Sequence, residues 1–173
     1  MKLKAKLIST IAAFAMVLCL TIVGVWAATT VTVSVTGNVS YIADDVDATV
    51  TGEITGINES GKGFTKTFNA ASTENSGAWD LSGITFVKNQ DVVITLTVKN
   101  NSTERPLQAR LENKGQAAGQ NTTAALGETT EATVAADTSA SFTFTIEVTD
   151  WNKQASYGIN LLLTLNNVAN PAA

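Results

Sequence analysis

Apolar and polar residues alternate with a period of two along most of the chain after residue 28. The clearest runs are 92–98, 142–148 and 159–165, where valine, isoleucine, leucine or phenylalanine occupies every second position. Most of the positions between them hold threonine, asparagine or glutamate. Because successive side chains of a strand point to opposite faces of a sheet, this pattern predicts strands that bury one face and expose the other.

The same alternation, in weaker form, predicts further strands. Residues 31–41 form one run that Gly37 interrupts, so a bulge or bend is expected there. Asp44-Asp45 predicts a turn, and the run from 46 to 54 follows it. Shorter strands are expected around Phe64 and Phe68, around Trp79 and Leu81, and over 107–111. Residues 115–140 are rich in alanine, threonine and glycine, which predicts a long loop with one edge strand.

These elements together predict the fold class. Seven to nine short strands are expected, and no segment after residue 28 has a sustained helical stripe. Half-buried strands of this kind are typical of an antiparallel two-sheet β-sandwich, Ig-like or jelly-roll-like, in which each sheet buries one face against the other. We expect residues 28–173 to form a single all-β domain behind an N-terminal signal helix.

The first 27 residues have the three parts of a secretory signal peptide. Lys2, Lys4 and Lys6 form a basic start, residues 7–25 are mainly apolar, and small Ala27 precedes the expected cleavage point. The apolar run is also long enough for an uncleaved membrane anchor, which is the alternative. It contains Ser9, Thr10, Thr21 and Gly24 and has no basic stop beyond it, which favours cleavage. The sequence therefore predicts a secreted or cell-surface protein.

Cleavage would change the charge of the chain. The 11 basic residues include the three signal lysines, so 8 would remain against 15 acidic residues, a net charge of −7. An acidic protein is repelled by nucleic acids and anionic lipids, so neither is an expected partner of the mature domain. Because the apolar segment would be removed, no membrane contact is expected after cleavage.

The residue types needed for most catalysis are missing. The sequence has no histidine, and its one cysteine, Cys19, lies in the expected signal peptide. No serine can therefore be matched with a histidine base, and the commonest zinc ligands are absent. We predict that the protein is not an enzyme, with no catalytic, cofactor-binding or metal residues and no cofactor.

Three groups of residues are candidate sites. The first is a calcium site, but its spacing matches no calcium loop and an acidic turn is usually solvated; its members are Asp44, Asp45, Asp47 and Glu53. The second is a sugar-stacking platform, against which the same rings serve as core or loop plugs; its members are Tyr41, Trp79, Trp151 and Tyr157. The third is an intramolecular isopeptide bond, which needs a buried lysine beside an acid; the lysines are Lys66, Lys88 and Lys99.

Gly24-Val25-Trp26-Ala27 is followed at once by a Thr/Val strand, and two further alternating runs extend from Val92 to Asn101 and from Ser141 to Ile146. In these features the chain resembles bacterial exported β-sandwich proteins of the TasA/camelysin type. The resemblance implies a jelly-roll-like sandwich and a fibre or matrix subunit. Two features of those proteins are missing here: the aromatic-Ser-Asp run after the cleavage site and any ligands for a metalloprotease metal.

The expected function is that of a secreted or cell-surface structural protein, either self-assembling into an extracellular matrix or fibre or associating with other surface proteins. Residues 29–36 would form a strand with a free end, able to complete the sheet of a second copy. In an isolated molecule, we expect that strand to pair within its own domain. The alternative function is a surface binding module that recognises a glycan or a protein through the sandwich loops.

Overall fold

The computed structural model describes residues 33–58, 62–70, 76–115 and 117–168, so the expected signal peptide and residues 29–32 lie outside it. The described part is all-β. No described segment is a helix, and none could therefore cross a membrane as one. Its twelve strands are β1 (Val33–Asp44), β2 (Ala48–Thr55), β3 (Gly63–Phe68), β4 (Ser76–Asp80), β5 (Ile84–Thr85), β6 (Val92–Asn100), β7 (Leu107–Asn113), β8 (Ala117–Gln120), β9 (Thr122–Leu126), β10 (Glu131–Val134), β11 (Ser139–Val148) and β12 (Ala155–Asn167).

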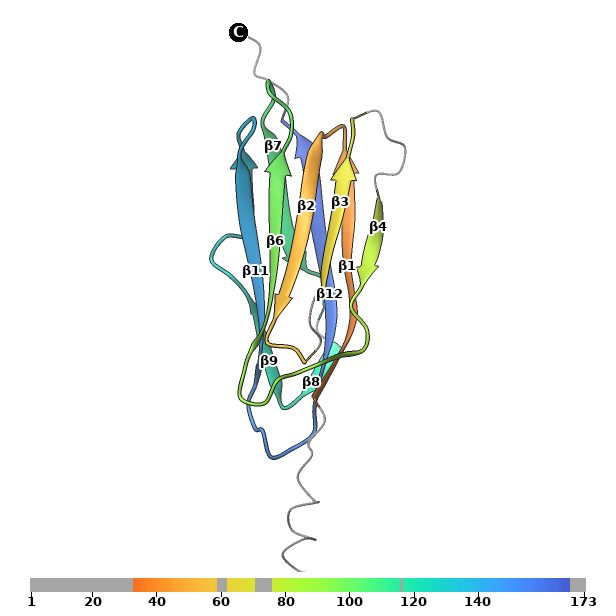
Figure 1. The fold of residues 1–173 in the computed structure, drawn as a ribbon, viewed down its shortest axis with the longest axis vertical. Coiled ribbons are helices and arrows are strands. Elements are labelled where there is room, and N and C mark those ends of the chain that lie inside the picture. Colours follow the sequence, from red (N-terminus) through yellow and green to blue (C-terminus); the bar gives the residue numbers. More distant parts are fainter. Residues whose placement is uncertain (1–32, 59–61, 71–75, 116, 169–173) are drawn as a thin grey trace, which may run out of the picture. The chain divides into compact units, whose positions relative to one another are not determined.

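The strands form two sheets in a sandwich-like arrangement (Figure 1). Sheet A has the order β10-β7-β12-β1-β4, with β5 pairing with β1 and β8 pairing with β12. Sheet B has the order β3-β2-β6-β11-β9. The connections pass repeatedly between the sheets, as from β1 to β2 and from β11 to β12.

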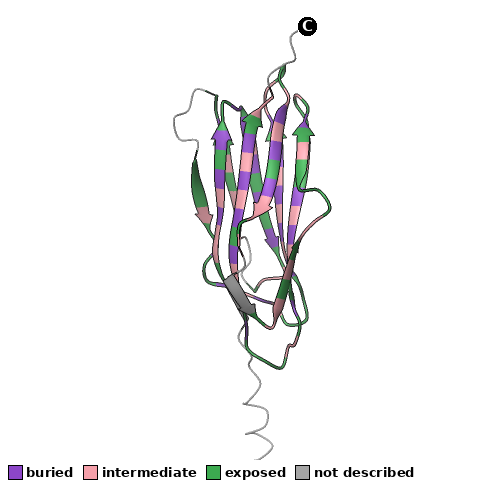
Figure 2. Cartoon of the chain, turned by 180° about the vertical axis from the view of Figure 1, so that it is seen from behind, coloured by how far each residue is buried: buried purple, intermediate pink, exposed green. Residues whose placement is uncertain are grey.

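The core consists of the inward-facing positions of the central strands. Buried and more exposed residues alternate along each of these strands (Figure 2), which confirms the predicted faces of 46–54, 92–98, 142–148 and 159–165. The side chains of Leu96, Phe144 and Leu163 are fully buried. Apolar burial of this extent is the main favourable term in folding, and the periodic sequence supplies it.

Threonine dominates the outward face of sheet B. Thr51 pairs with Thr65 on one side and with Thr97 on the other. Neighbouring hydroxyls also lie within reach of each other, at 3.3 Å for Thr49 and Thr67 and 3.0 Å for Thr97 and Ser141. β-Branched hydroxyl residues suit a half-exposed strand surface, which explains the polar half of the sequence pattern.

One pairing departs from the expected antiparallel arrangement. β1 and β12 run parallel over 12 positions, from Val33 beside Ala155 to Asp44 beside Asn166, at the centre of sheet A. Parallel neighbours cannot be joined by a tight turn, and they require a long connection. Here the connection is the remainder of the domain, because β1 and β12 are the first and last described strands.

Residues 115–140 also differ from expectation. They form the three strands β8, β9 and β10 rather than a loop with one edge strand. Each is short and pairs with one longer strand: β8 with β12, β9 with β11 and β10 with β7. Strands of only four or five residues offer too few positions for a clear apolar alternation, which explains why the sequence did not predict them.

Candidate functional site

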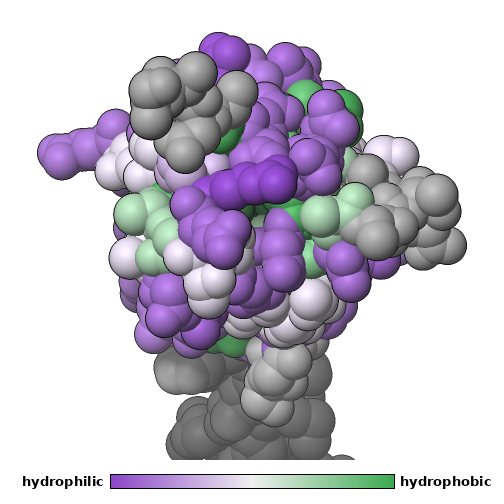
Figure 3. All heavy atoms as spheres, turned by 90° about the horizontal axis from the view of Figure 1, so that it is seen from above, coloured by the Kyte–Doolittle hydropathy of each residue, from purple (hydrophilic) through white to green (hydrophobic). Residues whose placement is uncertain are grey.

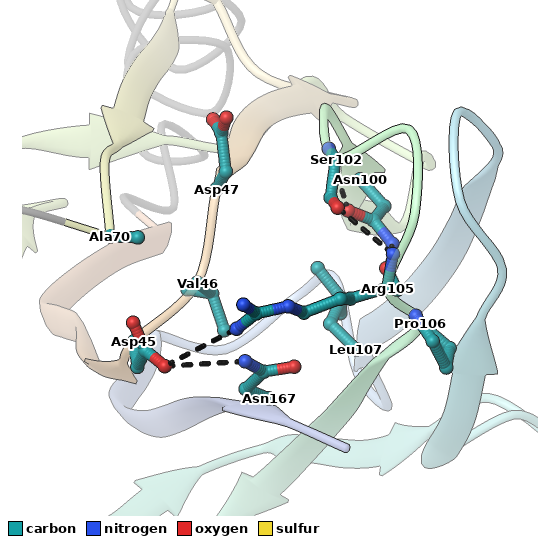
Figure 4. Close-up of a pocket in the computed structure, with 10 residues that line it drawn as sticks. All are labelled: Asp45, Val46, Asp47, Ala70, Asn100, Ser102, Arg105, Pro106, Leu107 and Asn167. Atoms are coloured by element: carbon teal, nitrogen blue, oxygen red, sulfur yellow. Dashed lines mark hydrogen bonds and ion pairs between the residues drawn. The ribbon is translucent and has the colours of Figure 1, made fainter. Parts of the chain in front are cut away.

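The turn between β1 and β2 carries the chain from sheet A to sheet B, at the end of the domain where β12 also ends. Asp45 in this turn has a φ of +50°, a left-handed conformation that costs a non-glycine residue about 1 kcal/mol. Its carboxylate accepts a hydrogen bond from Asn167 Nδ2 at 3.3 Å and lies 3.8 Å from the Arg105 guanidinium (Figure 4). The turn is therefore held by a loop residue and by the last residue of β12, both distant from it in sequence.

A cavity of about 310 Å³ opens beside this turn. The side chains of Val46 and Leu107, which are 4 % and 2 % exposed, belong to its lining. Asp45, Arg105 and Asn167 add polar groups, as the close-up shows (Figure 4). The coloured surface at this end of the domain is mostly hydrophilic (Figure 3). The cavity thus combines a small apolar floor with a carboxylate, a guanidinium and an amide.

Asn100 at the end of β6 is the buried polar residue of this region, with 1 % of its surface exposed. Its amide nitrogen donates to the carbonyl oxygens of Arg105 at 2.8 Å and Val134 at 3.0 Å, and its Oδ1 accepts from the Ser102 N–H at 3.0 Å. A side chain so fully bonded fixes the loop that carries Arg105 and links β6 to β10. We assign it a structural role.

The ion pair at the turn is exposed to solvent. The side chains of Arg105 and Asp45 are 62 % and 59 % exposed, and pairs of this kind contribute at most about 1 kcal/mol to stability. The pair can therefore break at little cost. An ion pair this weak suits a turn that attaches to and detaches from the Arg105 loop reversibly.

The acidic residues considered for calcium do not meet. Asp44, Asp45 and Asp47 lie in or beside the turn and are exposed, whereas Glu53 lies far along β2, paired with Gly63 and Thr95. Among the described residues, no group of three or more acidic, cysteine or histidine side chains is placed to hold a metal.

The four aromatic residues considered for sugar binding separate into three places. Tyr41 and Trp79 lie together, with ring centroids 4.6 Å apart. Trp151 instead contacts Phe86 at 6.3 Å. Tyr157 is buried against Phe144 at 6.0 Å. The structure therefore does not bring these rings onto one platform.

Two phenylalanines of the edge strand β3 join Tyr41 and Trp79 instead. Phe64 stacks on Trp79 at 4.4 Å, and Phe68 meets Tyr41 edge-on at 5.2 Å. Added Cβ atoms would lie 2.1 Å from the Phe64 ring at Gly52 and 2.4 Å from the Tyr41 hydroxyl at Gly77, so glycine makes room for both rings. Trp79 and Phe64 are half-buried. The cluster covers the side of the domain where β3 and β4 are the edge strands.

None of the lysines considered for an isopeptide bond is buried. Lys88 is exposed, and Lys99 forms an exposed ion pair with Asp137 at 3.6 Å. Lys66 is half-buried, with Nζ 6.0 Å from the centre of the Tyr41 ring. Isopeptide-bond formation requires a buried lysine, and none of these three lysines is buried.

The strand considered for donation lies partly within the described residues. Positions 33–36 pair with 155–158 of β12, and Ser34 and Val35 also pair with Thr85 and Ile84 of β5. This is the pairing within one domain that we expected for an isolated molecule. The remainder of the segment, 29–32, falls outside the description.

Three carboxylates, one exposed and two half-buried, have a lowered pKa. Hydrogen bonds from Ser82 lower the pKa of Asp80, a hydrogen bond from Lys114 lowers that of Glu112, and the Asn152 N–H lowers that of Asp150. None of the three lines the cavity at the turn. Each carboxylate accepts hydrogen bonds from residues two or three positions away, as is usual in turns and strand ends.

Sequence reasoning identified Asp45 but missed its partners. Arg105 and Asn167 are separated from it by 60 and 122 positions, and no local pattern links them. Chemically, the arrangement can hold or release the turn between the first two strands and can accept a small polar group in the cavity.

No protein-family model and no curated protein matches the chain.

Proposed function

We propose that the protein is an exported structural subunit that assembles outside the cell by exchanging its first strand between copies. The observation that carries the proposal is the position of β1. It lies inside sheet A between the central strand β12 and the edge strand β4, yet its covalent link to the other described strands is the single turn at Asp45. The sandwich would be of the jelly-roll-like or Ig-like type expected from the sequence.

Exchange would preserve the contacts of β1. A second copy presents the same groove between β12 and β4. In that groove, β1 of one molecule could form the same strand pairs that it forms in its own domain. Main-chain hydrogen bonds would supply affinity, and the buried side chains Val39 and Tyr41 would supply register. Donation in one direction, from each copy to the next, produces a filament when the rotation between copies does not close, whereas reciprocal exchange between two copies would give a dimer.

The turn at Asp45 suits the role of a hinge. Opening it would relieve the left-handed conformation of Asp45 and would break an exposed ion pair, a 3.3 Å hydrogen bond to Asn167 and the 2.9 Å backbone bond from Asn101 to Asp47. Domain swapping commonly depends on short hinges that are strained in the closed form. The exposed ion pair and the local strain lower the cost of opening the turn. The pairs of β1 with β12, β4 and β5 must also break, and exchange would restore them in the neighbouring copy.

A disulfide between β1 and β12 tests the proposal. Ile42 and Thr164 are register neighbours on the outward face, and Ile42 is 46 % exposed. In a Cys19→Ser background, Ile42→Cys with Thr164→Cys should form an intramolecular bond when monomer is oxidised. Light scattering should then show no assembly until a reductant is added. Oxidation after assembly should instead link neighbours into a covalent ladder, visible by denaturing electrophoresis.

The matched control places the same chemistry in sheet B. Thr49→Cys with Thr67→Cys joins β2 to β3, whose hydroxyls lie 3.3 Å apart, and should leave assembly at the parent rate. A parent protein that stays monomeric at high concentration and across pH would sink the fibre proposal. An oxidised β1–β12 variant that assembles as fast as its parent would show that β1 is not the exchanged element.

The second candidate function is a binding module, and the cavity beside Asp45 favours it. A carboxylate, a guanidinium and an amide around a small apolar floor can recognise a neutral polar ligand such as a sugar hydroxyl pair. The protein would then stay monomeric and bind glycans on an array. Arg105→Ala should abolish that binding, whereas Arg110→Ala, outside the cavity, should not.

A further inference from the structure

The two central strands of sheet A come from opposite ends of the described chain and run in the same direction. β1 and β12 are paired without interruption over 12 positions. On its other side, β1 is paired with β4 at five positions and with β5 at two. β1 is thus held on both sides along most of its length.

Parallel pairing places the two points of chain entry and exit at opposite ends of the sheet. The chain enters β1 at Val33 and leaves β12 at Asn167, as Figure 1 shows. A pull applied to the chain before β1 and after β12 therefore acts along the strand axis. It draws the two neighbouring strands past each other in opposite directions.

The direction of a pull decides how the hydrogen bonds between two strands fail. When strands are drawn past each other, the force is shared by all the bonds at once, and they must break together. When strands are peeled from one end, each bond carries the whole force in turn. A single bond contributes only about 0.5–1.5 kcal/mol, so a 12-position pair resists the first geometry far more than the second.

Side chains and backbone add to the resistance. A slip by one residue would turn the buried Val39, Tyr41 and Ala43 outward, so sliding cannot proceed in small steps. At Gly37, an added Cβ would lie 2.1 Å from the Ile159 carbonyl oxygen, which shows how closely the two backbones approach. The pair is therefore tightly registered as well as long.

We infer that the β1–β12 pair is a mechanical clamp, which keeps the domain folded under tension transmitted through its two chain ends. The inference rests on the proposed structural role only for the source of that tension. In a filament formed by strand exchange, β1 and β12 of neighbouring copies would meet in the same geometry, so the clamp would also hold subunits together.

Single-molecule force spectroscopy tests the clamp on the full chain in a Cys19→Ser background. Tethered through its two ends, the domain should unfold in one high-force event. The control adds Asp44→Cys as one tether and keeps the C-terminal tether. Both attachments then lie at the same end of the β1–β12 pair, and the force peels it. The unfolding force should fall severalfold, because unfolding under load follows the rate of the step being pulled. Equal forces in the two geometries would overturn the inference.

A second pair of variants locates the resistance within the fold. Gly37→Ala pushes β1 away from β12, whereas Gly83→Ala alters another glycine with positive φ that has nothing within 4 Å of an added Cβ. With end tethers, only Gly37→Ala should lower the unfolding force markedly. If Gly37→Ala does not fold, the comparison between end tethers and the Asp44 tether still tests whether the β1–β12 pair is the clamp. Because both measurements use single molecules, a protein that never assembles refutes the proposed function without affecting the clamp.

Discussion

The two sheets share one core but are held together in different ways. Sheet B is antiparallel throughout, and its central strand β6 pairs with β2 and β11 along nearly its full length. Sheet A is joined at its centre by strands that lie 122 positions apart in the sequence. Sheet B should therefore tolerate local damage, whereas the integrity of sheet A depends on one strand staying in place.

The largest effect is expected from breaking the centre of sheet A. Gly37→Ala adds a Cβ against the Ile159 carbonyl at a φ of +124°, and should destabilise the domain by about 3 kcal/mol or more. Gly83→Ala, at a φ of +78° in open space, should cost about 1 kcal/mol. Urea unfolding monitored by circular dichroism measures both. If the two variants lost similar amounts of stability, the backbones of β1 and β12 would be able to move apart more easily than their close approach at Gly37 suggests.

The next effect is expected where the two sheets are linked. Asn100→Ala leaves the carbonyl oxygens of Arg105 and Val134 without their donor and should cost about 2–3 kcal/mol. Asn101→Ala is the matched control. It removes a 3.0 Å bond to the Thr49 hydroxyl but keeps the backbone bond to Asp47, and should cost less than about 1 kcal/mol. Thermal unfolding of the two variants side by side would reveal any reversal of this order.

A smaller effect of opposite sign is expected at the contact between β12 and β11. The Tyr157 hydroxyl is buried and has no hydrogen-bond partner among the described residues. Tyr157→Phe removes it and should leave stability unchanged or raise it by up to about 1 kcal/mol. Tyr157→Ala, which also removes the ring packed on Phe144, should cost about 3–5 kcal/mol. A clear loss of stability in the phenylalanine variant would mean that the hydroxyl has a partner, such as an ordered water.

The smallest effect is expected at the edge of sheet A. The pKa of Asp80 is lowered in the folded protein by hydrogen bonds from Ser82, so its contribution to stability is complete above the unfolded-state pKa. It is lost as the pH falls through the folded-state pKa. Asp80→Asn should therefore flatten the acidic part of the melting-temperature profile slightly, and the exposed Asp91→Asn serves as the control. A steeper acidic slope in the Asp80 variant would contradict the direction of the shift.

The sequence predicted the central strands well and the edges poorly. Val92, Phe144 and Leu163 are buried where their alternation placed them, because a strand covered on one face needs that pattern. Edge strands such as β8 and β10 are stabilised by a neighbour, so their own residues carry little signal. The parallel pairing of β1 with β12 was also missed, since no turn connects these strands and register over 122 positions has no local signature.

The candidate site was predictable only in part. The acidic turn was recognised from its composition, but Arg105 reaches it from the loop between β6 and β7 and Asn167 from the end of β12, and no local pattern relates them to it. The aromatic residues were recognised as a type, and the structure divides them among three places. Side-chain partnership across a sandwich depends on the sheet order, which periodicity alone does not specify.

The spacing of β1 and β12 also sets the order of events during folding. Contacts between residues far apart in sequence form late, because the chain between them must first be ordered. In a chain that emerges from its N-terminus, β1 appears 122 residues before its partner. At roughly 5–20 residues per second, that interval lasts roughly 5–25 s. A domain that folds in the order of synthesis would leave the edge of β1 that β12 covers unpaired throughout that interval.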